Sequence, residues 1–167
     1  VQLHTALMEQ HFQQTPVVFR NTELIYNNDL ARFIAELGPY RGIVVEGADH
    51  ILGYRSPNYI YMAPGEQDLR LLLKNYRLSD DIAFRFSDKG WSEWPLTAEK
   101  FTQWVHQING DGYMCNLFLD YETFGEHQWE DTGIFQFLEA LPQHVLDTGA
   151  NDFKTPSECL EAFDAVG

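Results

Sequence analysis

The chain has 167 residues, of which 44% are hydrophobic and 14% aromatic, so it carries enough apolar material to bury the core of a folded protein. Its formal net charge of -14 argues against nucleic acid or an anionic membrane surface as a partner, because both attract basic patches. A neutral substrate is compatible with this charge, and the charge is equally compatible with a simple role in solubility.

The cysteines and the hydropathy pattern indicate a reduced protein without membrane spans. Cys115 and Cys159 are too few for a disulfide framework, so we expect a cytoplasmic location. The chain has no run of about 18 apolar residues, and residues 1–12 lack the charged region and cleavage site of a signal peptide. Because the chain starts without methionine inside a predicted helix, we expect the native N-terminus and any targeting signal to lie outside it.

The first part of the chain alternates between helical and strand patterns. Thr15-Pro16 ends the first helix, Asn27 can cap the second, and Gly38 closes it. The strands are short apolar runs. In chain order we predict a helix over 1–12, a strand over 17–19, a helix over 30–37 and a strand over 42–46.

The rest of the chain continues this alternation. Pro64-Gly65 marks a turn, Asn109-Gly110 ends a helix, and Thr155 to Glu158 form a capping box with proline at the first helical position. In chain order we predict a strand over 59–62, a helix over 67–76, a strand over 82–86, a helix over 97–108, a strand over 113–119, a short helix over 134–138 and a last helix from residue 156.

The repeated order of strand and helix predicts an α/β fold built from parallel βαβ units. The predicted strands are too few to close a barrel, since an eight-stranded β/α barrel typically needs about 250 residues. We therefore expect one domain over residues 1–167, which is either a small open sheet or a piece of a larger protein. Parallel sheets need both faces and both edges covered, so the isolated chain is expected to self-associate.

Polar residues with carboxylates follow three of the predicted strands. They are Glu23 after the strand over 17–19, Asp49 and His50 after the strand over 42–46, and Asp120 and Glu122 after the strand over 113–119. In parallel α/β folds the loops after the strand C-termini carry the chemistry, so these acids are better catalytic candidates than acids on a helix surface. The alternative is that carboxylates end strands because loops are solvated.

Three sequence stretches share an order and a spacing that are more specific than any single motif. They are Phe-Arg-Asn-Thr-Glu-Leu at 19–24, Val-Glu-Gly-Ala-Asp-His at 45–50 and Asp-Tyr-Glu-Thr-Phe-Gly-Glu-His at 120–127. Together they resemble the catalytic core of glycoside hydrolase family 57, whose members are α-amylases, 4-α-glucanotransferases, branching enzymes and related α-glucan enzymes. The resemblance covers residues 17–158. It implies part of an incomplete (β/α)7, TIM-like barrel whose N-terminal and C-terminal parts are absent.

The resemblance also implies a catalytic pair. Glu23 matches the glutamate after the threonine in the family's third conserved region, which implies that it is the nucleophile. Asp120 matches the first aspartate of the family's Asp-x-Glu-x-Phe-Gly pattern, which implies that it is the general acid/base. The family's His-Gln-Pro region, its second region and its final region are not in this sequence, so part of the sugar-binding wall is expected to be missing.

The chemistry of glycoside hydrolysis fits a pair of strand-end acids. In a retaining enzyme one ionised carboxylate attacks the anomeric carbon, and one protonated carboxyl donates a proton to the leaving oxygen. Two carboxyl groups held close together resist double ionisation, so such a pair supplies both forms. Glu122 is a third acid that either tunes the pair or lies solvated in the loop. Arg20 and Arg85 are expected to form structural ion pairs, and pairing with acids near the site is the alternative.

Several polar and aromatic residues near these motifs are candidates for substrate binding. They are His50, Asp49, Glu122, Phe124, Glu126, His127, Trp91 and Trp94. For His50 the alternative is a structural hydrogen bond, and for the tryptophans it is covering the core. Glu126, His127 and Glu130 mimic the spacing of metal ligands, but no tight histidine or cysteine cluster accompanies them, so we expect no metal and no cofactor.

The sequence thus predicts a retaining, α-amylase-like glycoside hydrolase that acts on α-1,4-glucans such as starch, glycogen and maltodextrins. A 4-α-glucanotransferase with the same residues is an alternative, since only the acceptor that resolves the glycosyl-enzyme differs. A non-catalytic carbohydrate-binding or scaffold domain is an alternative of another class, against which the intact Glu23 and Asp120 argue. An unrelated α/β protein that matches by chance is the third. The expected partner is an α-glucan or malto-oligosaccharide, with no nucleic acid and no membrane.

Overall fold

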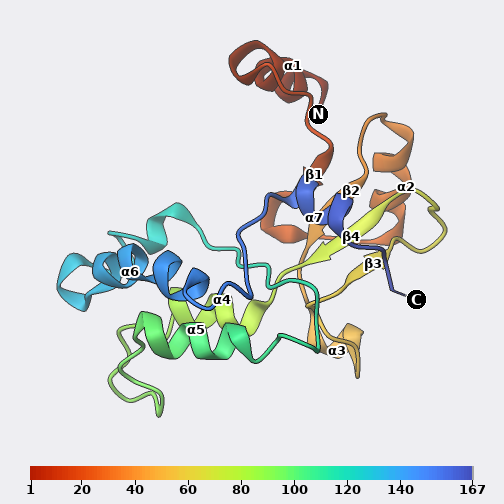
Figure 1. Cartoon of the computed structure of the whole chain (residues 1–167). Helices are drawn as coiled ribbons and strands as arrows, with labels where there is room; N and C mark the ends of the chain where they lie inside the picture. The colour runs from red at the N-terminus through yellow and green to blue at the C-terminus, as the bar shows by residue number, and fades with distance from the viewer. Residues whose placement is uncertain (167) are drawn as a thin grey trace. The chain divides into compact units, whose positions relative to one another are not determined.

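The computed structural model describes residues 1–166 of the chain, which divides into two compact units (Figure 1). The first unit consists of Val1–Glu46, Tyr59–Leu73 and Lys154–Gly167. The second unit consists of Gly47–Asn58 and Lys74–Phe153. Each unit is described by itself below.

The first unit is built on a four-stranded sheet in the order β1-β2-β4-β3. β1 pairs parallel with β2 and β2 pairs parallel with β4, whereas β3 pairs antiparallel with β4. All four residues of β2 are buried, as expected of an inner strand of a parallel sheet. The strands are β1 (Val18–Arg20), β2 (Gly42–Val45), β3 (Ile60–Met62) and β4 (Arg70–Leu73).

Three α-helices accompany this sheet: α1 (Gln2–Phe12), α2 (Asn28–Glu36) and α7 (Pro156–Ala162). α2 begins where the Asn27 side chain accepts a hydrogen bond from the Leu30 backbone N–H, and it buries Ala31 and Ile34. α1 buries none of its residues.

α7 contacts two strands of the sheet, β4 through hydrogen bonds and β2 through close packing. The guanidinium of Arg70 on β4 donates from Nη1 to the backbone oxygens of Leu160 (2.6 Å) and Phe163 (3.1 Å). Leu160 also packs against Gly42 on β2, where a Cβ atom would come within 2.7 Å of the leucine side chain. The helix itself starts with the predicted capping box between Thr155 and Glu158. Gly42 therefore lets α7 approach the sheet closely.

The second unit is helical around one apolar core. Its α-helices are α3 (Asp49–Leu52), α4 (Tyr76–Ala83), α5 (Ala98–His106) and α6 (Ile134–Leu146). The core joins Leu78 and Ile82 of α4 to Phe101 of α5 and Phe137 of α6. The ring of Phe137 meets that of Phe101 edge to face at 5.8 Å and that of Phe86 at 5.2 Å.

Several predicted elements are confirmed. The helices predicted over 1–12, 30–37, 97–108 and from residue 156 form with small shifts at their ends, and so do the strands over 17–19, 42–46 and 59–62. The helix predicted over 134–138 forms but continues to Leu146. The α/β class and a mostly parallel sheet are therefore confirmed, and the incomplete barrel stays a prediction.

Some predicted elements are wrong, and each error has a physical reason. The strand over 59–62 forms, but the expected parallel direction is wrong. It is antiparallel to β4 because the connection between the two strands is too short for a crossover, which takes about a dozen residues. The helix over 67–76 is replaced by β4, since a fully buried strand and a buried helix segment give the same apolar run. The strand over 82–86 does not form, because Ile82 lies in the last turn of α4, which ends at Ala83. Leu78, Ile82 and Phe86 recur at helical spacing and belong to the apolar core.

The strand predicted over 113–119 does not form. Its residues are in no strand, and their backbone groups bond instead to Asn58, Asn75 and Ser79. Asp120 therefore follows a segment that lies outside the sheet. Along residues 1–166 no helix is both long enough and apolar enough to cross a membrane.

Candidate functional site

In the first unit, Glu23 follows the C-terminal end of β1. It lies in the short 3-10 helix η1 (Thr22–Leu24), which starts where the Asn21 side chain accepts a hydrogen bond from the Thr22 N–H (3.0 Å). The Asn21 amide also donates to the backbone oxygen of Ile25 at 3.2 Å, which closes the turn. The side chain of Glu23 is exposed, whereas Leu24 is buried and anchors the turn.

The backbone at Glu23 is strained. Glu23 has φ 53° and Leu24 has φ 56°, so two successive non-glycine residues take the left-handed conformation. Each such residue costs on the order of 1 kcal/mol, and strain of this kind gathers at functional sites. The backbone N–H of Glu46, which directly follows β2, approaches the Leu24 oxygen at 3.4 Å. Two exposed acids thus follow neighbouring parallel strands at one edge of the sheet.

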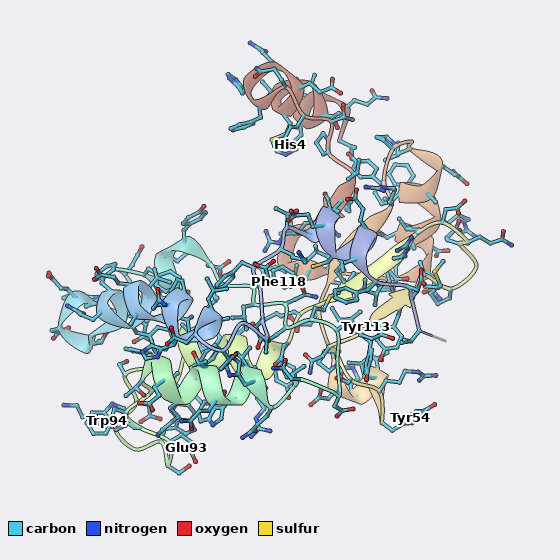
Figure 2. The ribbon with its side chains drawn as sticks, in the orientation of Figure 1. His4, Tyr54, Glu93, Trp94, Tyr113 and Phe118 are labelled. Atoms are coloured by element: carbon cyan, nitrogen blue, oxygen red, sulfur yellow. The ribbon has the colours of Figure 1, made fainter. Side chains whose placement is uncertain are left out.

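In the second unit, Asp120 belongs to a segment that we call the acid segment, residues 113–128. Figure 2 labels Tyr113 at its start and Phe118 just before the aspartate. Asp120 is exposed and stands immediately before the 3-10 helix η2 (Tyr121–Thr123), where its backbone oxygen accepts from the Thr123 N–H at 3.1 Å. Thr123 is buried and holds this turn against the unit.

The remainder of the acid segment is a tight loop. The backbone oxygen of Glu122 accepts from the N–H groups of Glu126 (3.2 Å) and His127 (2.9 Å), and Gly125 has φ 111°, which favours glycine. The side chains of Glu122, Glu126 and His127 are exposed. Phe124 is partly buried and packs against the apolar core, so its structural role is visible and a sugar contact is not.

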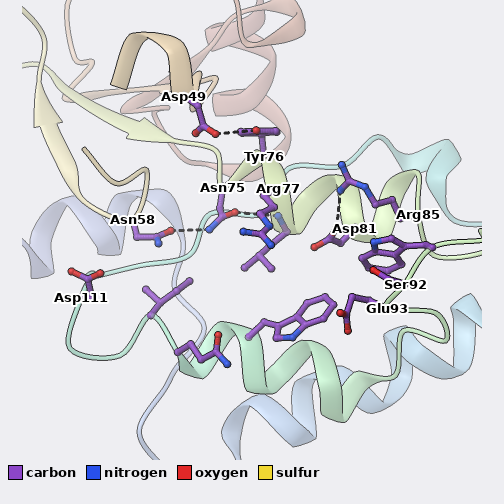
Figure 3. A pocket seen from close by; sticks show the side chains of 15 residues that line it. Asp49, Asn58, Asn75, Tyr76, Arg77, Asp81, Arg85, Ser92, Glu93 and Asp111 are labelled. Atoms are coloured by element: carbon purple, nitrogen blue, oxygen red, sulfur yellow. Dashed lines mark hydrogen bonds and ion pairs between the residues drawn. The ribbon is translucent and has the colours of Figure 1, made fainter. Parts of the chain in front are cut away.

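A second feature of this unit is a polar pocket of about 810 Å³ beside α4 and α5 (Figure 3). Its lining combines charged, amide and aromatic side chains. The charged ones are Asp49, Arg77, Asp81, Arg85, Glu93 and Asp111, the amides are Asn58, Asn75 and Gln107, and the aromatic ones are Tyr76, Trp91 and Trp104.

Hydrogen bonds arrange the pocket's polar groups. The Tyr76 hydroxyl donates to Asp49 Oδ2 at 3.0 Å, and this bond is the main reason why the pKa of Tyr76 is raised. The Asn75 amide donates to Asn58 Oδ1 at 3.0 Å, while Asn75 Oδ1 caps α4 by accepting from the N–H of Leu78. Figure 3 shows the Tyr76–Asp49 bond and the Asn75–Asn58 bond.

An ion pair joins Asp81 of α4 to Arg85, which lies two residues beyond the end of the helix. Arg85 Nη1 donates to Asp81 Oδ1 at 2.6 Å, and the Asp81 side chain is only 7% exposed. Burial raises the pKa of Asp81, and the hydrogen bond and charge of Arg85 act against this rise, as does the charge of Arg77. The expectation of a structural ion pair at Arg85 is therefore confirmed.

Two tryptophans form the aromatic part of the pocket. The rings of Trp91 and Trp104 meet edge to face, with centroids 6.0 Å apart. Trp94 is not among the lining residues; it projects from the loop before α5, with Lys89 Nζ 6.0 Å from its ring (Figure 2). His50 is exposed on α3 and also lies outside the lining.

Of the predicted substrate-binding residues, the pocket brings together Asp49 and Trp91. The predicted residues of the acid segment are not among its lining. The pairing of Glu23 with Asp120 across one cleft stays a prediction, because Glu23 belongs to the first unit and Asp120 to the second. Sequence reasoning missed Asn75, although this residue closely follows a buried strand, since that strand was interpreted as a helix.

The sequence does not predict a metal site. In the part of the chain that the structure describes, no group of three or more histidine, cysteine, aspartate or glutamate side chains is placed to hold a metal ion. The three residues that mimic ligand spacing, Glu126, His127 and Glu130, are all exposed.

Acids that follow the ends of parallel strands are the general arrangement of α/β enzymes. The chain belongs to glycosyl hydrolase family 57, whose family model matches residues 1–167, and the resemblance seen in the sequence is thereby confirmed. A protein of Methanocaldococcus jannaschii named "Putative alpha-amylase" is 49% identical over 167 residues, which are 100% of this chain and 35% of the relative. The chain thus spans about a third of that relative's length. No solved structure matches the chain.

Proposed function

We propose that the whole protein is a retaining, α-amylase-like hydrolase of α-1,4-glucans. Membership of glycosyl hydrolase family 57 supports the cleavage of glycosidic bonds, and the name of the M. jannaschii relative supports an α-glucan as the substrate. The observation that carries the proposal is the exposed Glu23 after the end of β1, where two successive residues are left-handed, because backbone strain of this kind gathers at functional sites.

In this mechanism Glu23 and Asp120 divide the work. The Glu23 carboxylate attacks the anomeric carbon and forms the glycosyl-enzyme, while the Asp120 carboxyl gives its proton to the leaving oxygen. Asp120 then takes a proton from the water that releases the sugar. A retaining reaction requires the two carboxyl groups to lie about 5 to 5.5 Å apart in the whole protein.

The pocket beside α4 is the proposed place for part of the glucan chain. Glucose rings offer apolar faces that stack on aromatic side chains, here Trp91 and Trp104, and rims of hydroxyl groups that pair with carboxylates and amides. Asp49, Asn58 and Asp111 supply such groups at its polar end. His50, Trp94, Glu122, Phe124, Glu126 and His127 are proposed only as contacts beyond this pocket.

The alternatives are separated by products and by binding. A 4-α-glucanotransferase would release longer and shorter glucans without a net gain of reducing ends, whereas a hydrolase increases them. A carbohydrate-binding domain without activity would give a binding isotherm with malto-oligosaccharides and no new reducing ends. A cytoplasmic location stays part of the proposal, and the two free cysteines are compatible with it.

Glu23→Gln tests the proposal directly. We expect the whole protein to lose turnover of maltodextrins, because an amide cannot attack the anomeric carbon. In Glu23→Ala, added azide should restore part of the activity on an activated aryl maltoside by taking the place of the carboxylate. Glu9→Gln, an exposed substitution on α1, serves as the control. Near-normal turnover by Glu23→Gln would remove this residue from the mechanism.

A further inference from the structure

α4 holds the acid segment along one of its faces. The backbone N–H of Asn75 donates to the oxygen of Asn116 at 2.8 Å, and the N–H of Phe118 donates to Ser79 Oγ at 3.2 Å. Farther on, Gln128 Nε2 donates to the backbone oxygen of Ala83 at 2.9 Å. The α4 partners recur at intervals of four residues, so they lie on one side of the helix.

These hydrogen bonds fix the backbone of the acid segment, as pairing with a neighbouring strand would fix the backbone of a β-strand. The segment leading to Asp120 is in no strand. In addition to the bonds to α4, the backbone oxygen of Asn58 accepts from Tyr113 N (2.9 Å) and Met114 N (3.2 Å). The side chains of Leu117 and Leu119 pack against the apolar core. Asp120 itself is exposed, so its position depends on how the backbone on either side of it is fixed.

The Ser79 hydroxyl both donates and accepts a hydrogen bond. It donates to the backbone oxygen of Asn75 at 2.8 Å, which turns an oxygen lone pair toward the N–H of Phe118. Ser79 is 1% exposed and Gln128 is 3% exposed, so water cannot easily replace either bond. One bond thus lies just before Asp120 and the other lies at the end of the loop that follows it.

We infer that Ser79 and Gln128 are positioning residues for Asp120, an inference that rests on the proposed role of Asp120 as the general acid/base. They hold the acid segment against α4 on both sides of the aspartate and touch no substrate. Proton donation depends steeply on the placement of the acid, and a displacement of about 1 Å costs up to a hundredfold in rate. Loss of either bond should therefore weaken proton donation.

The test compares two substrates in the whole protein. An unactivated malto-oligosaccharide needs a proton on its leaving oxygen, whereas an aryl maltoside with a good leaving group does not. We expect Ser79→Ala and Gln128→Met to lower kcat/KM by about tenfold or more on the oligosaccharide and by less than about threefold on the aryl maltoside. A purely structural defect reduces the fraction of active protein and lowers both values equally.

The controls keep the outcomes distinct. Thr102→Val removes a hydroxyl that is also buried in this unit but has no hydrogen-bond partner among the described residues, so the ratio of the two kcat/KM values should not change. Gln128→Met is expected to fold, since it also removes Oε1, a buried atom without a partner in residues 1–166. If Ser79→Ala does not fold, the comparison of the two substrates with Gln128→Met still decides the test.

Asp120→Asn separates the inference from the proposal on which it rests. Equal losses on both substrates in Asp120→Asn would show that Asp120 is not the acid, and the proposed function would fail. A selective loss in Asp120→Asn with equal losses on both substrates in Ser79→Ala and Gln128→Met would overturn the inference and leave the proposed function standing. Selective losses in all of these variants would support both.

Discussion

The conformation of Glu23 sets function against stability at a single residue. A left-handed glutamate costs free energy that glycine does not, because the strain comes from the Cβ atom. If the conformation is kept for catalysis, removal of the side chain should make the fold more stable while it removes the nucleophile.

We therefore predict that Glu23→Gly raises the free energy of unfolding by about 1 kcal/mol and abolishes turnover. Urea unfolding and a reducing-end assay measure the two effects. Gln13→Gly is the matched control, since Gln13 also has φ 53° but caps α1 at an exposed position, and its activity should be unchanged. A less stable Glu23→Gly variant would mean that contacts of the Glu23 side chain outweigh the strain.

At the scale of elements, one side of α4 contacts the acid segment and another side lines the pocket. Asn75, Ser79 and Ala83 hold the acid segment, whereas Arg77, Asp81 and Arg85 line the pocket. Both sets recur every four residues; Asn75 is the N-cap of α4, and Arg85 lies two residues beyond its end. Within the helix this spacing places Ser79 with Ala83 along one side and Arg77 with Asp81 along another. The buried Asp81 on the pocket face depends on Arg85 for its partner.

Arg85→Gln should therefore destabilise the protein in a pH-dependent way. Without Arg85 the pKa of Asp81 in the folded state rises further above its unfolded value of about 3.9. A raised folded pKa means that the folded state binds the proton more tightly, so stability is lost as pH rises through this window. We expect a loss of about 1 to 3 kcal/mol at pH 7 and little loss below the unfolded pKa.

Arg32→Gln is the matched control for this prediction. It breaks an ion pair with Asp29 of the same 2.6 Å length, but the two side chains are 63% and 85% exposed. Exposed pairs contribute about 0 to 1 kcal/mol, so the control should lose little at any pH. Unfolding curves at several pH values measure both variants. The same loss for both, independent of pH, would show that burial of Asp81 has no role.

How far the sequence predicted these elements depended on the range of the interactions that form them. Local signals, such as the Asn27 cap and the Thr155 capping box, gave α2 and α7 correctly. β4 was missed because its apolar run fits a strand or a helix equally well, and only pairing with β2 decides. The segment over 113–119 has the composition of a strand, but its backbone bonds to Asn58, Asn75 and Ser79, which no local pattern reveals.

The candidate site was predictable to a similar extent. The family resemblance named Glu23 and Asp120 as candidates, which stays a prediction, and the structure adds the strain at the first and the α4 attachment near the second. The pocket was found only in part, through Asp49 and Trp91. Asn75 and Trp104 meet there through tertiary packing, and their spacing along the chain gives no sign of it.

At the scale of the whole molecule, apolar surface is left uncovered. Leu3, Leu7 and Phe12 of α1 are 77%, 43% and 62% exposed, and the sheet of the first unit has only four strands with β1 and β3 at its edges. Val166 covers β3 through a bridge to Tyr61, whereas no strand within residues 1–166 pairs with the outer edge of β1. Open edges and apolar faces favour association.

We predict that the isolated chain of 167 residues self-associates, whereas the whole protein does so less. Sedimentation velocity over a range of concentrations should show a rising average mass for the isolated chain. Sharp, cooperative urea unfolding of a monomer at high concentration would be the opposite result. It would show that these residues form a complete domain and need no further chain to cover them.

The labelling rates of the two cysteines can measure how often each unit opens locally. Cys115 lies in the acid segment of the second unit, where burial raises its pKa to about 12, and Cys159 is buried in α7 of the first unit. Only the thiolate attacks a thiol reagent, and burial disfavours the thiolate. Each cysteine should therefore react only when its own surroundings open. The two labelling rates therefore report the opening equilibria of the two units separately, and the rate at Cys115 follows how often the backbone that carries Asp120 leaves α4.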